Sequence, residues 1–346
     1  MASCVNCTHV FNAAFDPKLM EYGQYYDNSL YFSPRFREYA ESLAERLIKD
    51  YGLHDKHIVE IGCGKGEFLN LLCKVGRNRG TGFDPSFESD RIAFDPEARI
   101  TVIKDFYSEH YNTYSADLIC CSHVLEHIHD PIEFLSTIRR AIGNRLETVV
   151  FFEVPNVLYT LKGLGIWDVI YEHCGYFTPQ SLAYLFRSLG FLPTKVSESY
   201  ETQFLCVDAI PLLVPSPFNE SKCKGTAKFT EATKAFSDRY HRRLEWWKEE
   251  LERIATHDMR VVLWGAGSKG VTFLNTCNVT DQIPYVVDIN PFKHGRHIPG
   301  TAQQIVTPDV LRHYDPDAII VMNPIYKKEI HDLLQQMGIS SDLLSV

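Results

Sequence analysis

Apolar and polar positions along the chain alternate in blocks that predict short buried strands, each followed by a helix. Apolar runs begin at His57 and Ala116, and runs of this length between polar turns are typical of buried strands. Segments with apolar residues every three to four positions follow them, over 65–76 and 131–142. This alternation predicts an α/β fold with a doubly wound, mostly parallel sheet.

Later features of the pattern predict how the chain is divided. A helix over 179–190 and a closing hairpin are expected at the end of the first domain. Residues 211–227 are rich in Pro, Ser and Gly, which is typical of a linker, and a long amphipathic helix follows. The strand pattern restarts at Met259. We therefore expect an N-terminal segment over 1–35, a first domain over 36–210, the linker and helix over 211–257, and a second, smaller α/β domain over 258–346.

Composition and charge are those of an ordinary globular protein. Of the 346 residues, 45% are hydrophobic and 23% are charged, and the net charge is −9. Without long basic runs, neither nucleic acid nor an anionic membrane is expected as a partner. The pattern indicates neither a signal peptide nor a spanning segment of ~18 apolar residues, and the ten cysteines are dispersed as in reduced proteins. We therefore expect a cytoplasmic protein, either a monomer or a small homo-oligomer.

A glycine-rich turn joins the first predicted strand of the sheet to the helix after it. Gly62, Gly64 and Gly66 lie within EIGCGKG, where a chain that turns tightly beneath a ligand has no room for Cβ atoms. The N–H groups at the start of the next helix favour a carboxylate or a phosphate. Asp84 ends the next predicted strand, where a carboxylate can accept both ribose hydroxyls of an adenosine ligand. Strand, loop, helix and spaced acid together predict a ligand site.

The G-x-G-x-G spacing, with Glu60 two positions before it, resembles motif I of class I S-adenosylmethionine (SAM) methyltransferases. The resemblance extends over about 36–200 and includes SHVLEHIHDP, which is similar to the family's segment after its fourth strand. It implies SAM as the cofactor, held at the ribose by Asp84 and bordered at the adenine by Asp105 and Phe106. The residues that the resemblance assigns to SAM binding are Glu60, Gly62, Gly64, Gly66, Asp84, Pro85, Asp105, Phe106 and His123.

A second glycine loop, GAGSKG at 265–270, repeats this layout in the second domain and has Asp288 after the next strand. The segments WGAGSKGVTFLN, VDINPFKHGRHIPGT and VMNPIYKKEI resemble the C-terminal domain of SAM-dependent C-methyltransferases that act on nucleotide-linked deoxy-ketosugars. In that subfamily the domain is Rossmann-like but is not regarded as an NAD site. Two interpretations of 259–346 stay open, an acceptor-side or structural role and a second nucleotide site.

Histidine and acidic residues follow several predicted strands, at the edge where open α/β sheets bind ligands. Glu172 and His173 begin EHCGYF, which resembles the subfamily's E-H-x-x-Y-F segment, whose histidine serves as general base. A histidine suits this role because its ordinary pKa of ~6.5 leaves it largely neutral at pH 7. The resemblance implies His173 as the base, oriented by Glu172, with His127 or Tyr26 as the donor near an enolate oxygen.

Two aromatic positions bear on that assignment. The segment YGQYYDNSLYFSP at 22–34 resembles the family's tyrosine-rich lid, and Tyr26 is its best match to an active-site tyrosine. The position two before Glu172 is Ile170, where the family has a tyrosine, and Tyr171 is displaced by one. The family's tyrosine role is therefore not assigned to this position. The identity of the acceptor does not follow from this segment either.

Two arrangements raise the question of a metal. Cys4 and Cys7 have the spacing of half a zinc site, and related sugar C-methyltransferases carry two such pairs in an N-terminal zinc domain. Because the chain has no second CxxC, these cysteines would hold a structural zinc only with an upstream pair. HVLEH would place His123 and His127 one helical turn apart, but a strand-to-helix turn is expected there, with no third ligand. We therefore expect no metal at the catalytic site.

Together these features predict a SAM-dependent C-methyltransferase of deoxysugar and natural-product biosynthesis. Its acceptor would be a nucleotide-diphosphate ketosugar, methylated through an enolate on the carbon next to the ketone. Three alternatives stay open: methylation of a non-sugar small molecule on carbon, oxygen or nitrogen; a non-catalytic SAM- or nucleotide-binding protein; and an NAD oxidoreductase that uses 259–346.

Overall fold

A computed structural model describes residues 1–20, 29–88, 94–95, 97–112, 114–213 and 226–346. Contacts divide the chain into two units. The first contains Glu38–Tyr159 and Tyr171–Ala232 together with the N-terminal strands. The second contains Asp27–Arg37, Thr160–Ile170 and Thr233–Val346. Segment 160–170 lies inside the expected first domain in sequence, but its contacts are with the second unit.

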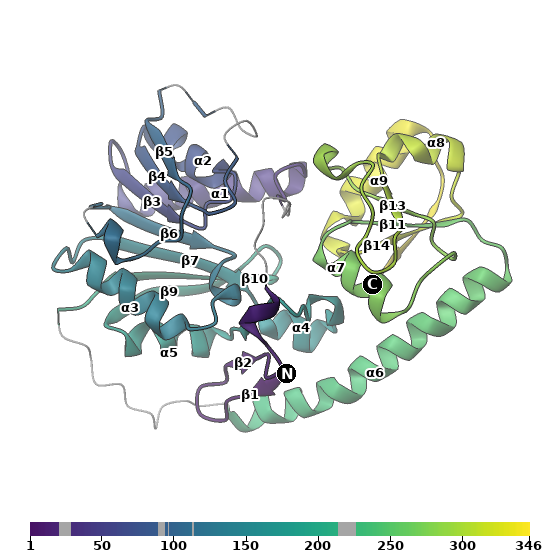
Figure 1. The fold of residues 1–346 in the computed structure, drawn as a ribbon, viewed down its shortest axis with the longest axis horizontal. Coiled ribbons are helices and arrows are strands. Elements are labelled where there is room, and N and C mark those ends of the chain that lie inside the picture. The colour runs from purple at the N-terminus through teal and green to yellow at the C-terminus, as the bar shows by residue number, and fades with distance from the viewer. Residues whose placement is uncertain (21–28, 89–93, 96, 113, 214–225) are drawn as a thin grey trace. The chain divides into compact units, whose positions relative to one another are not determined.

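The first unit is built on a seven-stranded sheet with the order β5-β4-β3-β6-β7-β10-β9 (Figure 1). The first five strands of this order are parallel, and β10 and β9 form an antiparallel hairpin beside β7. The doubly wound α/β prediction and the closing hairpin are thereby confirmed. The strands span Ile100–Ile103 (β5), Arg79–Phe83 (β4), His57–Ile61 (β3), Leu118–Ser122 (β6), Val149–Pro155 (β7), Phe204–Pro211 (β10) and Phe191–Ser199 (β9).

Helices cover both faces of this sheet. On one face, α3 and α5 bury their apolar residues in a core that includes Val59, Ile119 and Phe152. On the other face lie α2, whose Leu69 contacts Gly80 of β4, and α1, whose Arg46 lies over the ring of Phe151. Alternate residues of one strand therefore serve opposite layers. The helices span Pro34–Tyr51 (α1), Glu67–Gly76 (α2), Pro131–Ile142 (α3) and Pro179–Ser188 (α5), and Val157–Gly163 forms a further short helix (α4).

Local signals explain why two of these helices start where they do. The side chain of Asp130 accepts a hydrogen bond from the backbone N–H of Glu133, and a proline follows it at the first position of α3. Thr178 and Ser181 form a capping box at the start of α5, again with a proline at the first position. The predicted starts of both helices are confirmed.

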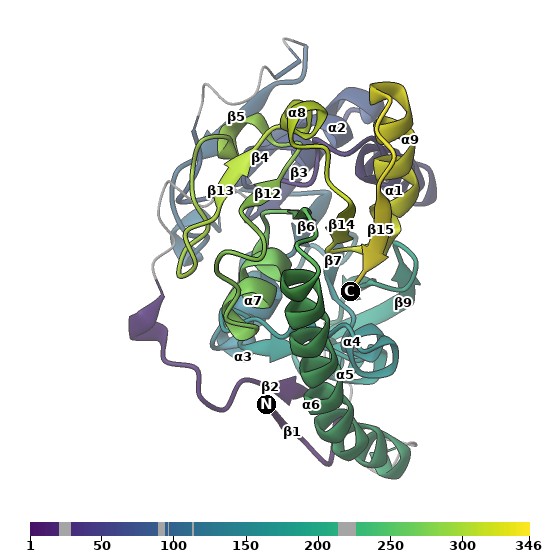
Figure 2. The ribbon, with the colours of Figure 1, turned by 90° about the vertical axis from the view of Figure 1, so that its right-hand side faces the viewer.

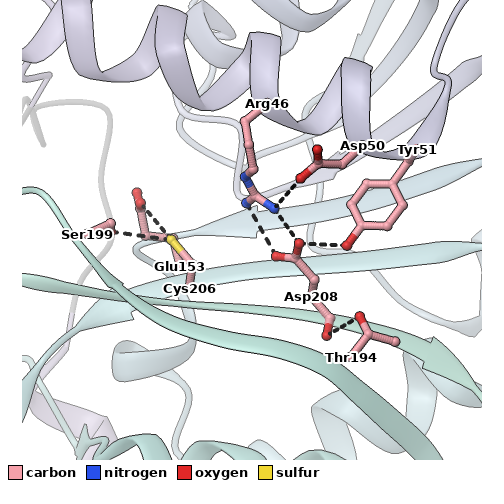
Figure 3. A network of polar contacts seen from close by, with 8 residues as sticks. All are labelled: Arg46, Asp50, Tyr51, Glu153, Thr194, Ser199, Cys206 and Asp208. Atoms are coloured by element: carbon pink, nitrogen blue, oxygen red, sulfur yellow. Dashed lines mark hydrogen bonds and ion pairs between the residues drawn. The ribbon is translucent and has the colours of Figure 1, made fainter.

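A buried ion pair joins α1 to the hairpin. Asp208 of β10 is 1% exposed, and both of its carboxylate oxygens accept hydrogen bonds from the guanidinium of Arg46 (Figure 3). The hydroxyl of Tyr51 donates to the same carboxylate at 2.6 Å. Since a buried carboxylate is stable only when it is paired, this network positions α1 on the sheet.

The N-terminal segment, expected to be irregular, contributes two short strands to a second sheet. Ala2–Ser3 (β1) and Val10–Phe11 (β2) join Gly175–Tyr176 (β8) in an antiparallel three-stranded sheet. The hydroxyls of Thr8 and Thr178 lie 2.7 Å apart within it. Short strands of this kind carry little sequence signal, because their pairing partner lies far along the chain. The N-terminus is thus attached to the segment that carries His173.

The second unit is a parallel five-stranded sheet with the order β13-β12-β11-β14-β15. It confirms the predicted second α/β domain, and Figure 2 shows β15 beside α9. The strands are Gln304–Val306 (β13), Tyr285–Val287 (β12), Val261–Trp264 (β11), Ala318–Val321 (β14) and Asp342–Ser345 (β15), and the helices are Thr226–Thr256 (α6), Ser268–Thr276 (α7), Leu311–Tyr314 (α8) and Lys327–Met337 (α9).

Several side chains of the long helix α6 are buried, among them Trp247, Leu251 and Ile254. Trp247 is fully buried and meets the ring of Phe273 of α7 edge-on at 5.1 Å. Trp167 packs against the same phenylalanine at 4.9 Å, which explains why the contacts of 160–170 are with this unit. In the described part of the chain, no helix combines the length and the apolar character needed to cross a membrane.

Candidate active site

The first glycine loop turns where the sequence predicts, between β3 and α2. Gly62, Gly64 and Gly66 all have left-handed backbone angles, with φ of +71°, +56° and +87°. A Cβ atom on Gly62 would lie 2.2 Å from the Cγ2 atom of Val124, a stiff side chain from the loop after β6. Glycine is therefore required at position 62 by both backbone conformation and space.

Asp84 lies beside this loop because the carboxyl ends of β3 and β4 are in register, with Ile61 paired to Phe83. Its Oδ2 atom accepts a hydrogen bond from the backbone N–H of Gly64 at 2.8 Å. Its Oδ1 atom accepts from the backbone N–H and the hydroxyl of Ser86, at 2.7 and 2.6 Å. These bonds fix the carboxylate at the loop, and Oδ2 keeps a lone pair for a ligand hydroxyl. Pro85 lies within this turn.

Glu60 is the acidic residue two positions before the loop, and it is 3% exposed. Burial, aided by the nearby carboxylate of Glu67, raises the pKa of Glu60 well above its usual range. Its Oε2 atom has no hydrogen-bond partner among the residues that the structure describes. A buried acceptor in this state fits a ligand that brings a hydrogen-bond donor, such as an amino group.

The residues expected near the adenine follow β5. Asp105 accepts a hydrogen bond from the hydroxyl of Tyr111 at 2.6 Å, which together with its bond from the Phe106 N–H lowers its pKa. The ring of Phe106 is 65% exposed. Sequence reasoning missed Tyr111, whose ring packs on Phe83 at 4.7 Å, because nothing in its local pattern links it to Asp105.

His123 follows β6 in a left-handed backbone conformation, with φ of +56°, and lies between two buried carboxylates. Its Nδ1 atom is 3.6 Å from Oε1 of Glu126, and its Nε2 atom is 3.1 Å from Oε1 of Glu153. Burial lowers the pKa of His123, but the two carboxylates outweigh it and raise the pKa to about 10. His123 is therefore an imidazolium at neutral pH and not a base.

The second carboxylate around His123 has further partners that the sequence did not indicate. Tyr39 of α1 donates a hydrogen bond to Oε2 of Glu153 and also contacts the Ser199 hydroxyl at 2.9 Å. The thiol of Cys206 donates to the same Glu153 oxygen at 3.5 Å (Figure 3). These residues come from α1, β7, β9 and β10, so only tertiary packing assembles them.

The two candidate catalytic histidines lie side by side. The ring centroids of His127 and His173 are 4.8 Å apart, and the planes are nearly perpendicular. His127 donates a hydrogen bond from Nδ1 to the backbone carbonyl of Glu172 at 3.2 Å. Glu172 therefore contacts this pair through its backbone carbonyl. Glu126 completes the group, and these histidines, together with His123, lower its pKa although burial raises it.

The remaining predicted residues lie at the margin of this arrangement or outside it. Tyr26 lies outside the described residues. Cys4 and Cys7 lie in a tight turn without a disulfide, and a backbone hydrogen bond at Cys7 lowers the pKa of Cys4. The Tyr171 hydroxyl accepts a hydrogen bond from the backbone N–H of Asp16 at 2.9 Å, so it serves the N-terminal segment.

Comparison with known proteins assigns a family description to each unit. Residues 31–196 match the family described as "Methyltransferase domain", and residues 220–341 match the "C-methyltransferase C-terminal domain". The C-methyltransferase NovU of Streptomyces niveus is 25% identical over 311 residues, covering 85% of this chain and 73% of NovU.

Two further similar proteins match a smaller part of this chain. The ubiquinone biosynthesis O-methyltransferase of Actinobacillus pleuropneumoniae serotype 7 (strain AP76) is 27% identical over 118 residues, which cover 31% of this chain and 49% of that protein. The plantazolicin methyltransferase BpumL, solved with a desmethyl plantazolicin analogue and S-adenosylhomocysteine, has 18% identity and a TM-score of 0.42. That alignment covers 52% of this chain and 86% of BpumL.

Proposed function

The chain is a class I SAM-dependent methyltransferase with a C-methyltransferase C-terminal domain, and from this premise we propose that it methylates a carbon atom next to a ketone. The observation that carries the proposal is the pair of imidazoles, His127 and His173, beside the buried carboxylate of Glu126. An amine nitrogen carries a reactive lone pair of its own, but a carbon atom next to a ketone becomes nucleophilic only when a base removes a proton.

Several described residues fit SAM. When bound, SAM supplies a methyl group on a positively charged sulfur. The glycine loop would lie under it, and Asp84 would accept hydrogen bonds from its ribose hydroxyls. The partnerless Oε2 atom of Glu60 would accept from its amino group. Pro85, Asp105 and Phe106 would border the nucleoside, and the ion-paired imidazolium of His123 would stay at the edge of this site.

The proton is handled by the histidine pair. His173 would take the proton from the carbon next to the ketone, and the negative charge would spread onto the ketone oxygen. His127 uses its Nδ1–H for the Glu172 carbonyl, so it can donate to that oxygen only from a protonated Nε2. The carboxylate of Glu126 lies within 4.8 Å of the histidine pair. Tyr26 would be the alternative donor.

The acceptor that we propose is a nucleotide-linked deoxy-ketosugar. Support comes from the resemblance of 259–346 to the C-terminal domain of sugar C-methyltransferases, and from the similarity to NovU, which is named a C-methyltransferase. A non-sugar ketone is the second candidate, because Ile170 stands where the sugar enzymes have a tyrosine. Incubating a panel of nucleotide ketosugars with labelled SAM tests both. A carbon-methylated sugar supports the first candidate, and transfer only to non-sugar ketones supports the second.

We expect Asp84→Ala to weaken SAM binding by about 1–3 kcal/mol, because the ribose hydroxyls lose a positioned acceptor. Calorimetric titration of SAM into the full chain measures this effect. Asp309→Ala removes an 81% exposed carboxylate and should leave the affinity unchanged. Equal SAM affinity in the Asp84 variant and the wild type would exclude Asp84 from the site.

We expect the second glycine loop not to bind NAD. Asp288, the residue that would accept ribose hydroxyls, is 8% exposed. Its Oδ2 atom accepts from the backbone N–H of Ala266 at 2.8 Å, as Asp84 does from Gly64, but the ammonium of Lys293 also lies 3.4 Å from it and competes for its remaining lone pair. The full chain should therefore show the same melting temperature with and without NAD, while SAM raises it. Micromolar NAD affinity would support the oxidoreductase alternative instead.

A further inference from the structure

We infer that Glu126, His127 and His173 form a binding site for a divalent transition metal such as Zn²⁺, and that the ion inhibits the enzyme by occupying His173. The inhibitory part rests on the proposed function, in which His173 is the base. The binding part does not. We call the three residues the His-Glu triad.

The positions of the ligand atoms carry the inference. One ligand atom from each member of the triad lies within 4.8 Å of the other two. Glu126 is 2% exposed, and its Oε2 atom has no hydrogen-bond partner in the described part of the chain. Two imidazoles and one carboxylate are the donor set of many zinc and non-haem iron sites. A movement of these side chains toward a common centre would place each ligand atom ~2.0–2.2 Å from the ion, which is the distance that Zn²⁺ requires.

The hydrogen bonds around the triad prepare it for a metal. His127 donates its Nδ1–H to the Glu172 carbonyl at 3.2 Å, which leaves the lone pair on Nε2. Metal-binding histidines usually make this second bond, because it fixes the tautomer and the ring orientation. His123 lies 3.6 Å from Oε1 of Glu126 and so occupies the other oxygen of that carboxylate. Both contacts correspond to the outer shell of a metal site.

The backbone around the triad also limits its movement. Glu126 and His127 belong to one short turn, Leu125–His127, and His173 lies just before β8. The thiol of Cys174 donates to the backbone carbonyl of Glu126 at 3.3 Å, which joins these two segments. β8 is paired with β2 in the small sheet. Ligands on segments joined in this way lose little conformational entropy when they bind an ion.

Zn²⁺ at the triad has one direct consequence for the reaction. A histidine nitrogen that coordinates a metal has committed its lone pair, so it cannot take a proton from the substrate. The metal therefore removes the base without denaturing the protein. A chelator that removes the ion restores His173 as a base, so the inhibition is reversible.

The test uses the whole chain without an affinity tag. A Cys4→Ser/Cys7→Ser background removes the two thiols that are the other candidate zinc ligands. Zn²⁺ is titrated by calorimetry without SAM or acceptor. One ion should bind, and Glu126→Gln and His127→Gln should each weaken it more than about 10-fold, a loss that even outer-shell changes cause. His129→Gln changes a neighbouring exposed histidine and should leave the affinity unchanged. Thermal melts confirm that each variant is folded.

Two further readouts separate the two parts of the inference. Co²⁺ bound at the triad should show visible absorption that is lost in Glu126→Gln, and this measurement needs no turnover. Zn²⁺ should stop methyl transfer and chelator should restore it. Failure to bind Zn²⁺, or equal affinity in the triad variants and in His129→Gln, would overturn the site. Tight binding with unchanged methyl transfer would overturn the inhibition, and absence of carbon methylation in the metal-free enzyme would refute the proposed function alone.

Discussion

We expect asparagine in place of His173 to lower the turnover of methyl transfer by about 10²–10⁴-fold, which is the usual contribution of a positioned base. Asparagine keeps a similar shape and a polar end but cannot accept a proton at neutral pH. SAM and acceptor binding should stay close to wild type, since the variant leaves the residues assigned to SAM unchanged and keeps a polar group at position 173. Single-turnover measurement with labelled SAM gives the rate of the chemical step.

Hydrogen exchange provides an independent readout of the same variant. If the wild type exchanges the acceptor's α-proton with deuterated solvent without methyl transfer, His173→Asn should stop that exchange. His129→Asn is the matched control, because His129 is exposed and stacks on Phe15 at 5.9 Å. A wild-type rate in His173→Asn would place the base elsewhere. Methylation of oxygen or nitrogen in the product would refute the enolate mechanism itself.

Arg46→Met should destabilise the protein by about 3–5 kcal/mol, because it leaves the carboxylate of Asp208 buried without its cation. The guanidinium binds both oxygens of that carboxylate, and Tyr51 donates to one of them (Figure 3). Tyr51 cannot replace the lost charge. The free energy of unfolding from urea denaturation of the full chain measures the change.

Two controls make this prediction specific. Arg253→Met breaks an ion pair with Glu250 at the surface of α6, so it should leave the free energy of unfolding of the first unit unchanged. The double variant Arg46→Met/Asp208→Leu removes both charges and should recover much of the loss, because an apolar pair of similar volume tolerates burial. If Arg46→Met has the same midpoint of urea unfolding as the wild type, the ion pair does not hold α1 on the sheet.

Most of the fold could be predicted because its determinants are local. The period of apolar residues distinguishes β6 from α3, and Asp130 followed by a proline marks the start of that helix. The glycine loop was predictable for the same reason, since three left-handed residues between a strand and a helix leave a recognisable spacing. Asp84 follows from this, because parallel neighbouring strands end at the same edge of a sheet.

The charges and contacts of the candidate catalytic site depend instead on packing between distant segments. The pKa of His123 depends on Glu153 of β7, which is distant in sequence. The partners of Glu153 come in turn from α1, β9 and β10. A pKa depends on burial and on charges within a few ångströms, and neither is encoded in local spacing. The sequence therefore predicted a histidine at this edge of the sheet but not its charge.

The grouping of His127 with His173 is the clearest case. The motifs that carry these histidines are separate in the sequence. The family resemblance implies that both act at one site, but the spacing within each motif predicts only a polar residue near the ligand edge. They meet because the segment before β8 returns to the turn after β6, where the Glu172 carbonyl binds His127 and the N-terminal strands pair with β8. Periodicity and glycine spacing were sufficient for most of the fold and for the glycine loop, whereas the His-Glu triad required long-range strand pairing, which short segments do not specify alone.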